Sequence, residues 1–122
     1  GIAGRLELPP ELIADVFDCS GDDPEIVIAA SKVDREKAAA SKQLALLVTA
    51  ARQAIGKEDW TSVGVIRDVC RDYGKLDSAN FATTLLSMGS IFNFRGKGQQ
   101  REVKLTRPGY ERATALVQEL TE

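Results

Sequence analysis

The spacing of apolar residues changes at Gly89, and this change limits the possible folds more than any other feature of the sequence. Before Gly89, apolar residues recur every three or four positions, as they do on one face of an α-helix. After it, apolar and polar residues alternate in two short runs, whose apolar members are Phe92, Phe94, Val103 and Leu105. Alternation of this kind is typical of strands with one buried face. We therefore expect a helical body followed by a two-stranded antiparallel hairpin.

Four stretches have the apolar spacing of helices: residues 34–55, 63–73, 78–88 and 106–120. Gly56 and Gly74 follow the first two stretches, and glycine commonly terminates a helix. The residues expected on the buried side of the third helix are Phe81, Leu85 and Met88, with Ala82 and Leu86 alongside. Leu46 and Ala50 lie off the apolar stripe of the first helix, so they are available to pack on the N-terminal segment or on another chain.

The N-terminal segment is acidic, because residues 1–30 contain one Arg against seven Asp or Glu and therefore carry a net charge of −6. It contains two short apolar runs, "LPPELIADVFD" and "DDPEIVIAAS". In the second run Asp23 can cap a helix and Pro24 can occupy its first position, which is a favoured arrangement. We expect residues 1–31 to form an appendage of short helices on a main domain at residues 32–122.

Several classes of function find no support in the composition. The chain has no His and only two cysteines, Cys19 and Cys70, so the usual zinc spacings and every His-based nucleophile are excluded. Since no glycine-rich phosphate loop follows a strand, we expect no enzyme activity, no cofactor and no metal.

Two lone cysteines are typical of thiols in the cytoplasm, although the sequence leaves open a disulfide between them. No apolar run reaches the length of a membrane helix, so no membrane association is expected. The chain begins with Gly1 rather than Met, so we expect a tag-cleaved product or a piece of a longer protein.

Basic residues are concentrated around the expected hairpin. Residues 91–112 contain six Lys or Arg and two Glu, a net charge of +4, whereas the whole chain has a net charge of −2. Gly96 and Gly98 flank Lys97 at the expected tip, and glycine allows a close approach of the backbone to a ligand. Cations on such a loop are suited to phosphate contacts. The alternative interpretation is that the same charges keep an exposed hairpin edge soluble.

Three passages resemble the winged helix-turn-helix superfamily: "WTSVGVI", "YGKLDSANF" and "FNFRGKGQQREVKLTRPGYERA". The resemblance covers about residues 34–120, and the hairpin that returns through "LTRPGY" is similar to many bacterial winged-helix regulators. It implies a mainly α-helical fold with a small antiparallel β-hairpin, here with an extra N-terminal helical segment. It also implies that the helix at 78–88 is a recognition helix for the major groove and that residues 96–101 form a wing beside the phosphate backbone.

The resemblance places candidate nucleic-acid-binding residues on the wing, on the recognition helix and in the turn before it. They are Arg95, Lys97, Gln99, Arg101, Lys104, Asn80, Thr83, Thr84, Ser87 and Lys75. Asn can pair with adenine and Thr can contact a thymine methyl group, but the helix contains no Lys or Arg. Arg67 and Arg71 each adjoin an Asp, so we expect surface ion pairs there. We expect Trp60 to be a packing anchor where the short strand meets the wing, and Cys70 to be a core thiol.

The leading hypothesis is that the chain binds nucleic acid, most simply double-stranded DNA, as a regulatory or targeting domain of a larger or oligomeric protein. A homodimer through the helix at 34–55 and the last helix is expected, because specific sites usually need two half-sites. The alternative is a winged-helix protein-interaction or oligomerisation module without nucleic-acid binding. A further hypothesis is that the acidic segment 1–30 folds back over the basic hairpin and competes with nucleic acid.

Overall fold

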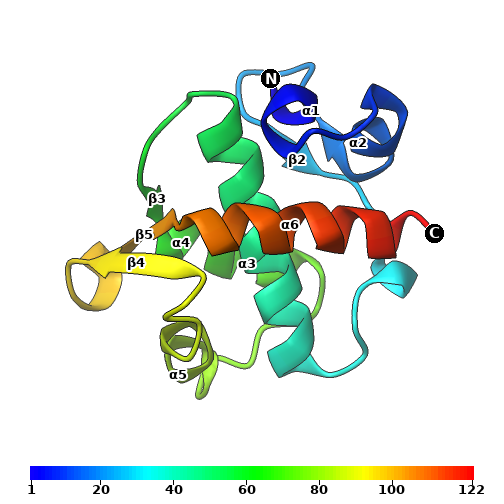
Figure 1. Cartoon of the computed structure of the whole chain (residues 1–122). Helices are drawn as coiled ribbons and strands as arrows, with labels where there is room; N and C mark the ends of the chain where they lie inside the picture. Colours follow the sequence, from blue (N-terminus) through cyan, green and yellow to red (C-terminus); the bar gives the residue numbers. More distant parts are fainter.

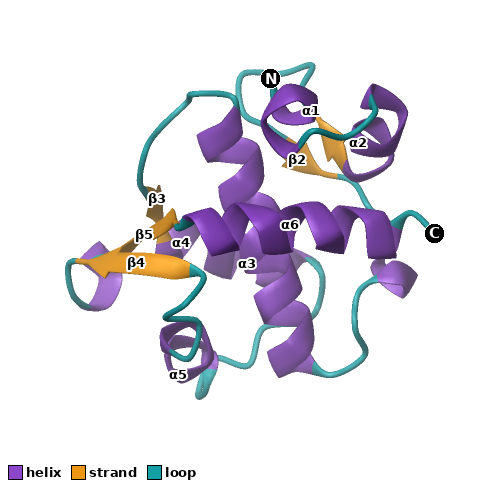
Figure 2. Ribbon diagram, viewed as in Figure 1, coloured by secondary structure: helices purple, strands orange, loops and turns teal.

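The computed structural model describes Gly1–Glu122 and consists of helices and two small antiparallel sheets (Figures 1 and 2). The α-helices are α1 (Ile2–Leu6), α2 (Pro10–Val16), α3 (Lys37–Ala54), α4 (Val63–Asp72), α5 (Phe81–Leu86) and α6 (Arg107–Leu120). The strands are β1 (Phe17–Asp18), β2 (Glu25–Ile26), β3 (Thr61–Ser62), β4 (Phe92–Arg95) and β5 (Glu102–Leu105). Short 3₁₀ helices cover Ala30–Lys32 and Gly98–Gln100. None of the helices combines the length and the apolar composition that are needed to cross a bilayer.

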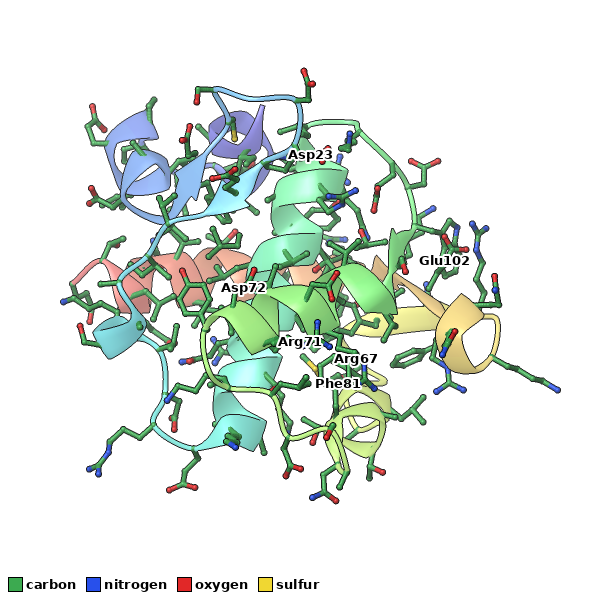
Figure 3. All side chains as sticks on the ribbon, turned by 180° about the vertical axis from the view of Figure 1, so that it is seen from behind. Asp23, Arg67, Arg71, Asp72, Phe81 and Glu102 are labelled. Atoms are coloured by element: carbon green, nitrogen blue, oxygen red, sulfur yellow. The ribbon has the colours of Figure 1, made fainter.

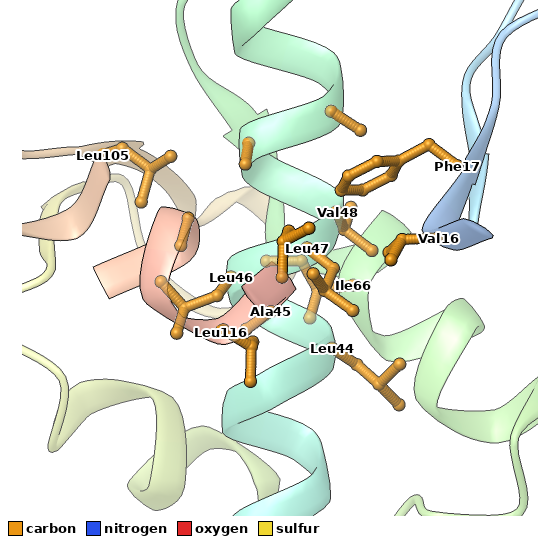
Figure 4. Packing of buried hydrophobic residues seen from close by; sticks show 14 of the residues in the cluster. Val16, Phe17, Leu44, Ala45, Leu46, Leu47, Val48, Ile66, Leu105 and Leu116 are labelled. Carbon is orange, nitrogen blue, oxygen red and sulfur yellow. The ribbon is translucent and has the colours of Figure 1, made fainter. Parts of the chain in front are cut away.

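Helix α3 runs through the centre of the molecule (Figures 1 and 4). Every residue from 44 to 51 is buried, and α1, α4, α5 and α6 all pack against this helix. Three of the buried positions in this run are Ala, whose small side chains allow the neighbouring helices to approach closely. Leu46 and Ala50, which lie off the main stripe, are 4% and 0% exposed. The second face of α3 is therefore covered by the chain itself and not left for a partner.

The predicted hairpin is confirmed and forms part of a three-stranded antiparallel sheet with strand order β3-β5-β4. Phe92 pairs with Leu105, and Phe94 pairs with Val103, so these apolar side chains share one face as their alternation predicts. Ser62 ends β3 and caps α4 by accepting a hydrogen bond from the Gly64 N–H, at 3.1 Å.

Gln53 of α3 joins this sheet to the central helix. Its Nε2 donates to the Val103 carbonyl and to Thr61 Oγ1, both at 3.1 Å, and its Oε1 accepts from the Leu105 N–H at 3.0 Å. One side chain thus fixes the sheet to α3, which sets the position of the hairpin.

The prediction of a helix at "DDPEIVIAAS" is wrong, because this run contains strand β2. Ile26 pairs with Phe17 in an antiparallel register, and the Val27 N–H donates to the Val16 carbonyl at 2.7 Å. Three consecutive β-branched residues, Ile26, Val27 and Ile28, favour the extended conformation over the helix that Asp23 and Pro24 suggest.

The N-terminal segment contributes to the same hydrophobic core as the rest of the chain. Leu6, Val16 and Phe17 are 2%, 0% and 3% exposed, and the last two pack beside α3 (Figure 4). The Tyr73 hydroxyl donates to the Ile28 carbonyl at 2.7 Å, which links α4 to the same segment. The segment packs on α3 and α6, away from the β4–β5 hairpin (Figure 1), so the hypothesis that it folds back over the basic loop is wrong.

The two cysteines are free and lie in different environments. Cys19 is exposed, whereas Cys70 is fully buried on the apolar face of α4. Burial raises the pKa of the Cys70 thiol and stabilises its neutral form. The prediction that Cys70 is a core thiol is confirmed, and the disulfide left open by the sequence is not formed.

Candidate nucleic-acid interface

The loop between β4 and β5 is a short, ordered turn. Gly96 and Gly98 have φ angles of +77° and +54°, in the left-handed region that favours glycine. The Gln100 N–H donates to the Lys97 carbonyl at 2.9 Å, and the Arg101 N–H donates to the Gly98 carbonyl at 3.2 Å. These bonds close the 3₁₀ turn and fix the backbone at the tip of the hairpin.

The two loop glycines give a matched pair of variants. A Cβ atom on residue 96 would lie 2.5 Å from the Gln100 carbonyl oxygen, whereas a Cβ on residue 98 has no atom within 4 Å. We expect Gly96→Ala to change the loop conformation and to lower stability by about 1–3 kcal/mol, because steric overlap adds to the unfavourable φ. Gly98→Ala meets only the φ penalty and should cost about 1 kcal/mol. Thermal denaturation and amide chemical shifts of residues 94–103 measure both effects, and equal effects would contradict this interpretation.

Of the four Lys and Arg side chains of the hairpin, one forms an ion pair with a carboxylate and three do not. Arg95 Nε donates to Glu102 Oε1 at 2.8 Å, so its charge is paired across the two strands. Lys97, Arg101 and Lys104 form no ion pair, although six other Lys or Arg side chains do. Lys97 and Lys104 are exposed and Arg101 is half-buried. The hairpin therefore presents three unpaired cations and one paired cation.

Trp60 precedes β3 and lies outside the hydrophobic core. The Arg95 guanidinium carbon lies 4.4 Å from the centroid of the indole ring, and Lys104 Nζ lies 6.0 Å from it. The expected position beside the short strand is correct, but the ring contacts cations instead of core residues. Cation–π contacts of this kind orient Arg95 and Lys104 on the polar face of the sheet.

Helix α5 begins later and ends earlier than the predicted helix at 78–88. Phe81, Leu85 and Met88 are buried as predicted, at 1%, 1% and 6% exposure. Residues 78–80 form a turn, in which the Asn80 N–H donates to the Asp77 carbonyl at 3.1 Å and Asn80 Nδ2 donates to Asp77 Oδ2 at 2.9 Å. The bond from the Asn80 N–H to the Asp77 carbonyl spans three residues, as in a tight turn, and not the four residues of an α-helix, so α5 begins only at Phe81.

The polar residues predicted for base contacts are only partly available. Asn80 is engaged by Asp77, and Ser87 Oγ donates to the Thr84 carbonyl at the end of the helix. Thr83 is exposed and its side chain makes no hydrogen bond, whereas Thr84 is half-buried. Of the four candidate residues at α5, only Thr83 is both exposed and free of side-chain hydrogen bonds.

Two further predictions about α5 and its surroundings are corrected. Ala82 and Leu86 are exposed and not on the buried side, with Leu86 at 46%, because α5 packs mainly on α3 and is open on its outer face. Arg71 forms a surface ion pair as predicted, but with Asp68 one helical turn earlier, at 2.9 Å, and not with the adjoining Asp72, and Arg67 forms no ion pair. Its guanidinium carbon lies 4.9 Å from the Phe81 ring centroid, between α4 and α5 (Figure 3).

Lys75 lies apart from the other candidate residues. Its Nζ donates to the Arg35 carbonyl at 3.2 Å, and its own carbonyl accepts a hydrogen bond from Ser41 Oγ at 3.3 Å. These bonds attach the α4–α5 connection to the segment before α3. Lys75 follows the C-terminal end of α4, whereas the hairpin contacts the N-terminal end of α4 through the bond from the Val63 N–H to the Arg101 carbonyl, at 3.0 Å.

A hollow of about 630 Å³ is lined by residues of the hairpin loop, α4 and α5, and the sequence did not predict it. Its lining includes Val63, Arg67, Phe81, Ala82, Leu85 and Arg101. Gln99, another candidate residue, and the carboxylate of Asp68 also line it. No local pattern joins positions so far apart in the chain, so only the tertiary fold reveals this site.

Comparison of the chain with protein-family models, with curated proteins and with solved structures finds no match. The assignment of a function therefore depends on the charges and the geometry of the hairpin, α4 and α5.

Proposed function

We propose that this chain is a winged-helix domain that binds double-stranded DNA through its β4–β5 hairpin. The element order from α3 to α6 supports this proposal: helix, strand, helix, helix, two-stranded hairpin and helix, with sheet order β3-β5-β4. In this reading α4 and α5 form the helix-turn-helix, and residues 96–101 form the wing.

The observation that carries the proposal is the set of unpaired cations on the wing. Lys97, Arg101 and Lys104 lack carboxylate partners, while Arg95 is paired with Glu102. A cation without an ion pair can neutralise a phosphate without first leaving a carboxylate partner. Lys97 is exposed and forms neither an ion pair nor a cation–π contact, Arg101 is half-buried, and Lys104 lies 6.0 Å from the Trp60 ring. The wing therefore supplies the affinity, and Arg95 together with Trp60 keeps its polar face ordered.

Helix α5 adds little to sequence discrimination in this proposal. It contains no Lys or Arg, and of its candidate residues Thr83 has the most exposed side chain that is free of hydrogen bonds. A single contact from Thr distinguishes one base from another less strongly than a bidentate contact from Arg or Asn does. We expect preference for duplex geometry more than for a particular sequence.

The test is fluorescence anisotropy with a generic labelled duplex at several salt concentrations. Three to four phosphate contacts predict that log K falls with log salt at a slope of roughly −3 to −4. A slope near this value supports a phosphate-directed interface. Absence of binding at the lowest salt concentration contradicts the proposal.

One observation favours the alternative of a protein-interaction module: Leu86 is 46% exposed on the outer face of α5. An apolar side chain at this position has no partner on DNA except a thymine methyl group.

The predicted homodimer through α3 and α6 stays a proposal, but the apolar residues of both helices are largely buried within the chain. We retain a cytoplasmic regulatory or targeting role as part of the proposal and assign no catalytic step to the chain.

A further inference from the structure

A second hollow, of about 560 Å³, is lined by residues 23–26 around strand β2, by α3 and by α4. Four of its apolar lining residues are only half-buried, so a ligand can reach them: Ile26, Val65, Val69 and Tyr73. Covering apolar surface of this kind is favourable because it removes that surface from water. The volume lies in the range of sites that receive ligand side chains. The hollow can therefore bury an apolar side chain of a ligand.

The rim of this hollow is negatively charged. Four carboxylates line it, two from the β2 segment and two from α4, and Figure 3 labels Asp23 and Asp72 on this face. Asp23 and Asp68 each form an ion pair with a neighbouring cation. Glu25 and Asp72 are exposed and form none of the ion pairs of the chain. Two carboxylates, one on each side of the hollow, are therefore free to bind a cation.

The surroundings do not offset this negative charge. Arg52 is the only cation in the lining, and it is paired with Glu58 at 2.8 Å. All seven Asp and Glu of residues 1–30 are exposed, and only Asp23 among them forms an ion pair. No group of three or more carboxylates is placed to hold a metal ion. The negative charge thus extends along the rim and suits a ligand whose cations are spread along a chain.

We propose that this hollow docks a basic, extended segment of a partner protein, with an aliphatic side chain over Val65 and Val69 and Lys or Arg side chains beside Glu25 and Asp72. Residues that alternate along an extended chain point to opposite sides, so apolar ones can face the floor while basic ones reach the rim. The negative rim repels nucleic acid and anionic lipid.

A second copy of this chain fits the hollow less well. Its basic loop at residues 96–101 contains only Gly, Lys, Gln and Arg, and so has no apolar side chain for the floor. The hollow also differs from the one beside the hairpin, with which it shares only Asp68. This inference goes beyond the proposed DNA binding and does not require it.

The experiment measures the anisotropy of a fluorescein-labelled short peptide in which Lys alternates with Leu or Val. One control peptide has Gln in place of each Lys, and a second has Ser in place of each Leu and Val. The parent chain is expected to bind the first peptide at least about tenfold more tightly than either control, because both the rim and the floor contribute. The proposal is overturned if the parent does not bind the first peptide, or if either control binds as tightly.

The decisive variant is Glu25→Gln combined with Asp72→Asn, which removes the two free carboxylates and breaks no ion pair. Its matched control is Glu11→Gln combined with Asp15→Asn, at exposed positions of α2 that do not line the hollow. The first variant should weaken peptide binding about tenfold and the control by less than about twofold. Equal losses would mean that binding follows total charge, and they overturn the proposal. Circular dichroism confirms that both variants are folded.

Two further measurements distinguish the other occupants. Sedimentation velocity of the parent at low salt detects self-association, and its loss in the Glu25 and Asp72 variant would assign the hollow to a second copy and overturn the proposal. Titration with the labelled duplex should give the same affinity for this variant as for the parent. Peptide binding without duplex binding supports this inference and contradicts the proposed DNA function, and duplex binding without peptide binding does the reverse.

Discussion

The triple variant Lys97→Gln, Arg101→Gln and Lys104→Gln is expected to bind duplex DNA roughly a hundredfold to a thousandfold more weakly than the parent near 0.1 M salt. Each cation lost removes one phosphate contact, so the log–log salt slope should become shallower by about 1 per residue, or about 3 in total. Gln keeps much of the side-chain length and its polarity, so the variant isolates the charge. The measurement is anisotropy of a generic labelled duplex over a series of salt concentrations.

The matched control removes the same charge from another face. Lys32, Arg35 and Lys37 are exposed, form no ion pair and lie before or at the start of α3, far from the hairpin (Figure 1). Their replacement by Gln should change the slope by much less than the triple hairpin variant. If both triple variants lose affinity equally, binding reflects total charge and the hairpin is not the interface. Arg95→Gln alone should have a smaller effect than Lys97→Gln, because Arg95 is already paired with Glu102.

Phe17→Ala is expected to destabilise the whole protein by about 3–5 kcal/mol and to lower its melting temperature by roughly 10–20 °C. Phe17 is 3% exposed and packs with Val16 beside α3 (Figure 4), so the truncated side chain leaves a cavity in the shared core. A change of this size is a large part of the stability of a domain, which is typically about 5–15 kcal/mol. Thermal and urea denaturation followed by circular dichroism measure the loss.

Val27→Ala is the matched control, since Val27 follows strand β2 and is 46% exposed. Its effect should stay within about 0.5 kcal/mol. The shortened chain 32–122 lacks seven buried apolar residues, and at about 1.5–3 kcal/mol each their lost burial is as large as, or larger than, the stability of a typical domain. We expect this shortened chain to be unfolded. A cooperative transition near that of the parent would instead support the predicted domain boundary at residue 31.

The main helices and the hairpin could be predicted from the sequence because their patterns are local. The helical spacing of Leu44, Leu47 and Val48 places them on a common face, and the alternation around the loop places Phe92 opposite Leu105. Each pattern requires only that one face of an element be buried. The β2 strand was missed because helix-start residues and β-branched residues compete within one short run, and pairing with β1 decides the outcome.

The residues of the candidate interface could be predicted from the sequence, but which of its cations form ion pairs could not. The sequence places Arg95, Lys97, Arg101 and Lys104 on one hairpin, and the structure does so as well. Which of them is paired depends on the strand register, because Arg95 lies directly opposite Glu102. Likewise, the sequence suggested an ion pair for Arg67, but the approach of α5 to α4 places its guanidinium over Phe81.

The order of the helices, the hairpin and the basic character of its loop follow from the sequence by itself, since hydrophobic periodicity and glycine positions act over a few residues. The shared core of the N-terminal segment, the choice of unpaired cations and the hollow beside Phe81 depend on contacts between residues tens of positions apart. Those contacts are selected by the packing of all elements around α3, and no local pattern encodes that packing.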